Sequence, residues 1–146
     1  MTVDERGQVG GLEALVLGVL VFVAGVLIVS NAWGVIDAKL AASSAAREAA
    51  RAYVEASSVD AAAVAARQAA DEAIAGHGRT PSRARVVQLG GAFARCSRVT
   101  FEVSYPVPLM RVPFLGSAGA GFTARARHSE VVDPYRSGLA GTASCA

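Results

Sequence analysis

The side chains best suited to catalysis in this chain are too scattered to form a recognisable active site. His77 lies between glycines and His128 near the end of an expected strand, with no cysteine or carboxylate at metal-ligand spacing. Asp71 and Glu72 are adjacent, so on a helix they point about 100° apart and cannot share a proton. We therefore interpret all four as surface residues and expect no enzyme, with no catalytic, cofactor-binding or metal-binding residues.

Two cysteines offer a different chemistry. Cys96 and Cys145 could form a disulfide in an extracytoplasmic domain, whereas in the cytosol both thiols would stay reduced. Closing a loop of about 50 residues stabilises a fold by roughly 4 kcal/mol at most in the chain-entropy model. The residues leave both interpretations open, a disulfide and two unpaired thiols.

Glu13 stands at the start of a long apolar run, where a carboxylate is costly to bury. Insertion scales give about 2.5–3.5 kcal/mol for a charge at the centre of a membrane and less near its surface. One interpretation leaves Glu13 hydrated at the interface. The other pairs it with the α-amine of a neighbouring subunit, as a charge-assisted contact in a low-dielectric assembly.

The composition limits the kind of core that these residues can belong to. The chain has 146 residues, of which 53% are hydrophobic but only 6% aromatic, and 31 are alanines. A large core of aromatic and branched side chains is excluded, and so is general disorder. The formal charge of +2 is too small to indicate nucleic acid as a partner.

The hydrophobicity is concentrated in residues 14–36, which contain no charge. A helix of this length reaches about 34 Å, enough to cross a hydrocarbon core of about 30 Å. The run predicts a transmembrane helix in a lipid bilayer, after a polar leader at residues 1–13. A cleaved signal peptide is the alternative, but its apolar region normally has about 7–15 residues and follows a positively charged segment, whereas this leader is net acidic.

Helix continues beyond the apolar run. Residues 35–75 contain neither glycine nor proline, and we expect a break at residues 56–58 with a serine capping a second, alanine-rich helix that ends at Gly76. Small residues recur every four positions on the first helix and form a ridge. This ridge packs against partner subunits in one interpretation and against the chain's own second helix in the other. Its members are Ser30, Gly34, Ala38, Ala42, Ala46 and Ala50.

Strand patterns follow the second helix. Residues 85–89 and 98–105 predict two strands, the latter alternating clearly and stopped by Pro106 and Pro108, which lack a ladder donor. Residues 122–128 alternate again after a connection at 109–121. The sequence thus predicts an α+β domain at residues 37–133, in which the helices pack on a small antiparallel sheet, and a flexible tail at 134–146.

The order of these parts, together with several local strings, resembles a known family. A short polar leader with Arg6-Gly7, the string Leu12-Glu13-Ala14-Leu15, and the string SSAAREAAR at residues 43–51 are similar to TadE-like minor pilins, or pseudopilins. These belong to the tight-adherence (Flp) pilus machinery, and the chain looks like their actinobacterial branch. The strings VTFEVSYPVP at 99–108 and VDPYR at 132–136 extend the resemblance over nearly the whole chain.

This resemblance implies a pilin-like fold and a structural, membrane-anchored role in type IV pilus assembly. Its implied partners are other pilins or pseudopilins, the assembly platform proteins and a prepilin peptidase that cuts after a glycine. Carried over, Gly7 precedes the cut and Glu13 is the assembly carboxylate. The family has four residues between them and this chain has five, so a cut after Gln8 would restore the spacing but lose the glycine.

Orientation signals disagree. Only Arg6 precedes the apolar run while Lys39, Arg47 and Arg51 follow it, which by the positive-inside rule places the C-terminal part in the cytoplasm. That rule is weak for large translocated domains, and the cysteine pair favours the outside. We expect a single-pass protein of the cytoplasmic membrane, with the N-terminus inside and the C-terminal domain outside. The alternative function is a membrane accessory subunit that binds or regulates another complex without entering a fibre.

Overall fold

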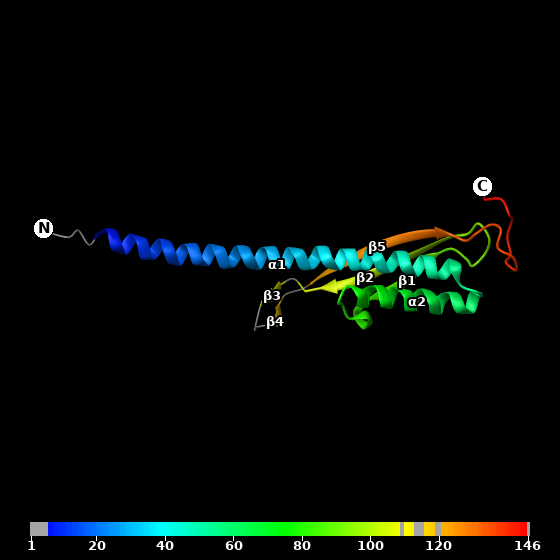
Figure 1. The fold of residues 1–146 in the computed structure, drawn as a ribbon, viewed down its shortest axis with the longest axis horizontal. Helices are drawn as coiled ribbons and strands as arrows, with labels where there is room; N and C mark the ends of the chain where they lie inside the picture. The colour runs from blue at the N-terminus through cyan, green and yellow to red at the C-terminus, as the bar shows by residue number, and fades with distance from the viewer. Residues whose placement is uncertain (1–5, 109, 113–115, 119–120, 146) are drawn as a thin grey trace.

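The computed structural model describes residues 6–108, 110–112, 116–118 and 121–145, and only the backbone of residues 6–12, 110–112 and 116–118. Its dominant element is α1 (Arg6–Glu55), a single helix whose C-terminal half packs on the rest of the chain while its N-terminal half extends away from it (Figure 1). The second helix, α2 (Val59–Gly76), runs back along α1 and leads into a short 3₁₀ helix, η1 (Pro81–Arg83). The molecule is therefore α+β, as the sequence predicts.

The break between the two helices follows from a cap. Ser58 has an extended backbone, and its hydroxyl accepts a hydrogen bond from the backbone N–H of Ala61 at 3.2 Å. Asp60 lies in the first turn, where a negative charge is favoured by the helix dipole. The predicted capping serine and the predicted end at Gly76 are both confirmed.

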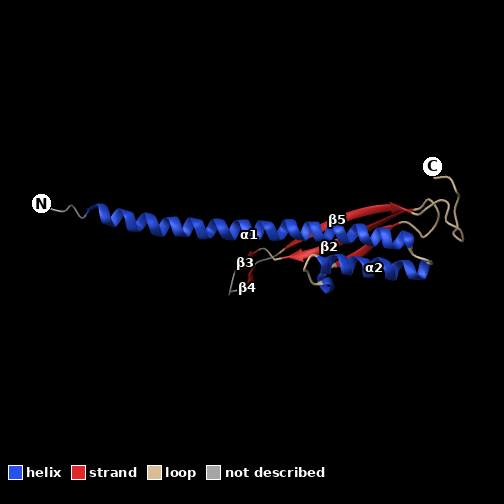
Figure 2. Cartoon of the chain, in the orientation of Figure 1, coloured by secondary structure: helices blue, strands red, loops and turns tan. Residues whose placement is uncertain are grey.

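Three strands form an antiparallel sheet in the order β1-β2-β5 (Figure 2). Its members are β1 (Arg85–Gly90), β2 (Arg98–Val107) and β5 (Phe122–Val131). Two short strands, β3 (Met110–Val112) and β4 (Gly116–Ala118), pair separately. The alternation predicted for β2 is confirmed, because Val99, Phe101, Val103, Tyr105 and Val107 are all buried.

All three strands extend beyond their expected ends, with β1 ending at Gly90 and β5 at Val131. Pro106 does not end β2, since it lies opposite Thr123 of β5 and the strand continues to Val107. The reason is that β1 pairs with β2 only as far as Ser104, so Pro106 lies where β2 has become an edge strand and tolerates a missing donor. The connection at residues 109–121 also contains the β3–β4 pair, which its proline and glycine content concealed.

The buried faces of α1 and α2 consist mostly of alanine rather than of bulky side chains. α1 packs against α2 and also against β2 and β5. Seven alanines of α1 and three of α2 are fully buried, which allows the helix axes to approach closely. They are Ala38, Ala41, Ala42, Ala45, Ala46, Ala49 and Ala50 of α1 and Ala62, Ala66 and Ala70 of α2.

Gly121 is required where the chain returns from β4 to β5. A Cβ atom on this residue would lie 2.3 Å from the backbone oxygen of Val107, closer than real Cβ contacts. Only glycine therefore lets the start of β5 pass beside the end of β2.

Candidate functional site

The N-terminal half of α1 exposes a long apolar surface. Its most apolar 18-residue window is entirely unburied, and the exposed side chains include Leu15, Phe22, Ile28 and Trp33. One helix of the described chain is thus long and apolar enough to cross a membrane. Glu13 lies exposed near its start.

The proposed processing positions lie within the helical part of the chain. α1 begins at Arg6, so the backbone of Gly7 and Gln8 belongs to its first turns. Their side chains lie outside what the structure describes.

The fold buries one part of the small-residue ridge and leaves the other part accessible. Ala38, Ala42, Ala46 and Ala50 are fully buried inside the domain, whereas Gly34 is half-buried and Ser30 is exposed. The C-terminal part of the ridge, from Ala38 to Ala50, therefore packs against other parts of the same chain. Only its N-terminal end is open to another molecule.

Arg79 connects the end of α2 to α1. Its Nη2 lies 2.6 Å from Oδ2 of Asp37 and also donates to the carbonyl oxygen of Gly34 at 2.9 Å. The guanidinium lies over the ring of Tyr105 at 5.1 Å from its centroid, in cation–π contact. We call Gly34, Asp37, Arg79 and Tyr105 the Arg79 junction. It fixes the domain to α1 at the level where the apolar run ends.

Sequence reasoning did not identify the Arg79 junction. Asp37 and Arg79 are 42 residues apart in the chain, so no local spacing relates them. The available signal is that Asp37 is the first charge after the apolar run and Arg79 directly follows the glycines that end α2. Antiparallel helices bring those two positions together.

At the opposite end of the domain, the C-terminal segment closes over α1. Cys96 and Cys145 form a disulfide, and the backbone N–H of Arg95 donates to the carbonyl of Ala140 at 2.9 Å. The Arg136 guanidinium donates to the carbonyls of Val54 and Ala56 and lies over the ring of Phe93. A cation thus satisfies the carbonyls that remain free where α1 ends.

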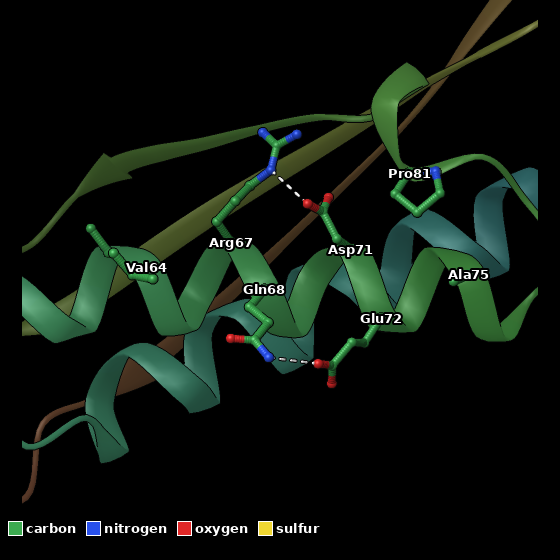
Figure 3. A pocket seen from close by; sticks show the side chains of 8 residues that line it. Val64, Arg67, Gln68, Asp71, Glu72, Ala75 and Pro81 are labelled. Carbon is green, nitrogen blue, oxygen red and sulfur yellow. Dashed lines mark hydrogen bonds and ion pairs between the residues drawn. The ribbon is translucent and has the colours of Figure 1, made fainter.

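The acidic pair on α2 does not converge. Asp71 receives a hydrogen bond from Arg67 at 3.1 Å, and Glu72 receives one from Gln68 at 2.9 Å (Figure 3). The two carboxylates point in different directions beside an open groove of about 710 Å³ on the outer face of α2. Among the described residues, no group of histidine, cysteine and carboxylate side chains could hold a metal ion.

One carboxylate on the sheet is electrostatically perturbed. Glu102 lies opposite Arg127 in the β2–β5 register, and the hydrogen bond from Arg127 lowers the pKa of the Glu102 carboxyl. Because the folded pKa is lower than the unfolded one, this contact adds stability above the unfolded value and loses it as the pH falls through the folded value. The pair is a cross-strand contact of the sheet.

Comparison with protein-family models, with curated proteins and with solved structures finds no match to this chain.

Proposed function

We propose that this protein is a membrane-anchored minor pilin, or pseudopilin, of the TadE-like type. Its apolar half-helix crosses the cytoplasmic membrane from an inside N-terminus, and the α+β domain lies outside. It acts as a structural subunit that joins other pilins at the assembly platform of a tight-adherence pilus. Pilin-like architecture, orientation and partners are all part of this proposal.

The observation that carries the proposal is the bare apolar half of α1. Each large apolar side chain left in water forgoes about 1.5–3 kcal/mol of burial free energy, and this segment exposes many of them. Lipid before assembly and neighbouring subunits after assembly would each cover that surface. A helix that is continuous from the apolar part into the domain also couples the two rigidly, which suits a subunit extracted from a membrane into a fibre.

Glu13 supplies the first test. We expect Glu13→Ala to insert normally but to reduce pilus output, because the variant lacks a carboxylate for a neighbour's α-amine. Glu55→Ala is the matched control, since Glu55 is an exposed carboxylate on the same helix. Pilus yield and membrane fractionation are measured in parallel. Normal pilus output from Glu13→Ala would contradict the assembly role.

Proteolytic processing of the N-terminus distinguishes the pilin proposal from the alternative of a membrane accessory subunit. We expect mass spectrometry of the protein from its host to find a new N-terminus after Gly7 or Gln8, dependent on a prepilin peptidase. An intact Met1 terminus in cells that have the peptidase would favour an anchored subunit that never enters a fibre. Deleting the peptidase gene provides the uncleaved reference.

A further inference from the structure

An exposed apolar patch lies directly beyond the apolar run, where α1 meets the start of β5. Ile36 is 51% exposed, Leu40 57% and Phe122 57%, and Val35 adjoins them. With Lys39 and Arg125 they line a shallow groove of about 460 Å³. We call these six residues the basal patch.

The basal patch lies next to a charged contact that marks where hydrocarbon must end. The Arg79 guanidinium binds the carbonyl of Gly34, and a guanidinium is costly to place in hydrocarbon. Asp37, which pairs with Arg79, is also charged and adjoins the patch in sequence.

These features shorten the segment available to hydrocarbon. If lipid tails end before Gly34, residues 14–33 remain, and a helix of that length measures about 30 Å, equal to the thickness of the hydrocarbon core. Trp33 then lies at the boundary, where tryptophan is favoured. Ile36 follows about 4–5 Å further along the axis, inside a headgroup layer about 5–8 Å thick.

The charges of the basal patch suit the same layer. Lys39 and Arg125 are exposed, and no carboxylate is among the residues that line the groove. Lys39 donates to the backbone carbonyl of Arg125, which holds its ammonium at the edge of the apolar residues. Asp37, the carboxylate nearest in sequence, is paired with Arg79. Aromatic and aliphatic side chains bordered by cations are typical of surfaces that lie in a membrane interface.

We propose that the basal patch rests on the outer leaflet of the bilayer that α1 spans, with Ile36 and Phe122 among the headgroups and with Lys39 and Arg125 at lipid phosphates. The inference rests on the membrane-spanning role proposed above. It adds a second contact, made by the domain itself. Leaving the membrane for a fibre then requires detaching the domain as well as extracting the helix.

Tryptophan quenching tests this contact in the full chain, because Trp33 is its sole tryptophan. The protein is reconstituted in phosphatidylcholine–phosphatidylglycerol vesicles whose acyl chains carry bromine near the headgroups. Two probes replace patch residues in a Trp33→Phe background, Phe122→Trp and Ile36→Trp. Tyr135→Trp in the same background is the control, because Tyr135 is 83% exposed on the C-terminal segment beyond β5.

We expect bromine to cause a loss of emission from both patch probes and from Trp33 in the unmodified protein, and no loss from Tyr135→Trp. If Trp33 is quenched while both patch probes behave like Tyr135→Trp, the contact is overturned and the span survives. If Trp33 itself is not quenched, the span fails as well. Patch probes shielded from aqueous iodide but insensitive to bromine would instead indicate a contact with a second copy of this chain and would also overturn the lipid contact.

Discussion

At the scale of single residues, Arg79 concentrates more interactions than any other side chain at the base of the domain. Its side chain is only 14% exposed, and it contacts a carboxylate and a backbone carbonyl of α1 and an aromatic ring of β2. Lysine could not reproduce this set, because a single ammonium lacks the planar fork of a guanidinium. Arg79 therefore orients the domain relative to the apolar half of α1.

We expect Arg79→Ala to lower the free energy of unfolding by about 1–2 kcal/mol, because it leaves the Asp37 carboxylate without its donor and removes the additional hydrogen bond to the Gly34 carbonyl. The 38% exposure of Asp37 keeps the loss at the low end, since solvent screens the remaining charge. Denaturant unfolding in detergent measures the change.

Arg83→Ala is the matched control for this variant. Arg83 also lies over Tyr105, at 5.7 Å from the ring centroid, but its side chain is exposed. We expect a change within about 0.5 kcal/mol. Equal losses from the two variants would show that the ring contact, and not the bond to Asp37, carries the effect.

At the scale of elements, the pairing of α1 with α2 depends on the absence of side-chain volume. The buried positions recur every four residues on both helices, so their ridges and grooves are shallow and matched. The fold thereby hides most of the ridge that the sequence left open to a partner. What remains accessible is the end of the ridge at Ser30 and Gly34 and the apolar half of α1.

Enlarging a buried alanine tests this packing. We expect Ala46→Leu to destabilise the domain by about 1–3 kcal/mol, because Ala46 is fully buried where α1 packs on the rest of the domain and the added carbons would strain that packing. Ala63→Leu is the control, since Ala63 is exposed on the outer face of α2. Thermal unfolding followed by circular dichroism compares them, and an unchanged transition for Ala46→Leu would refute the close contact.

At the scale of the whole molecule, the two ends of the domain are held to α1 by different contacts. One end carries the Arg79 junction and the basal patch, beside the apolar run. The other is closed by the disulfide and by Arg136, which caps the final carbonyls of α1. The domain is thus attached to α1 at both ends of the C-terminal half of the helix. A force applied to the helix would therefore be transmitted to the sheet.

The disulfide gives a prediction about the compartment of the domain. We expect alkylation of the native protein in membranes to modify no thiol, and alkylation after reduction to add two adducts, because an outside domain stays oxidised. Mass spectrometry counts the adducts. The double variant Cys96→Ser/Cys145→Ser, which has no thiol, is the control that should gain no adduct. Two thiols that react without reduction would place the domain in the cytosol.

The sequence by itself determined the features that depend on neighbouring residues. The apolar run, the serine cap at Ser58 and the alternation along β2 follow from local periodicity and from a side chain bonding its own backbone. The sequence prediction that Pro106 ends the strand was wrong. The effect of a proline on a strand depends on whether a neighbouring strand lies on the side where its nitrogen would need a hydrogen, and only the sheet determines this.

Tertiary structure alone decided how distant segments meet. The Arg79 junction, the burial of most of the ridge and the convergence of Phe122 with Ile36 and Leu40 all join positions dozens of residues apart. No periodicity encodes such meetings, because they arise from the antiparallel return of α2 and from the register of β5. The sequence thus determined that an apolar helix must be shielded from water. The fold decided which apolar surfaces remain exposed and therefore available for that contact.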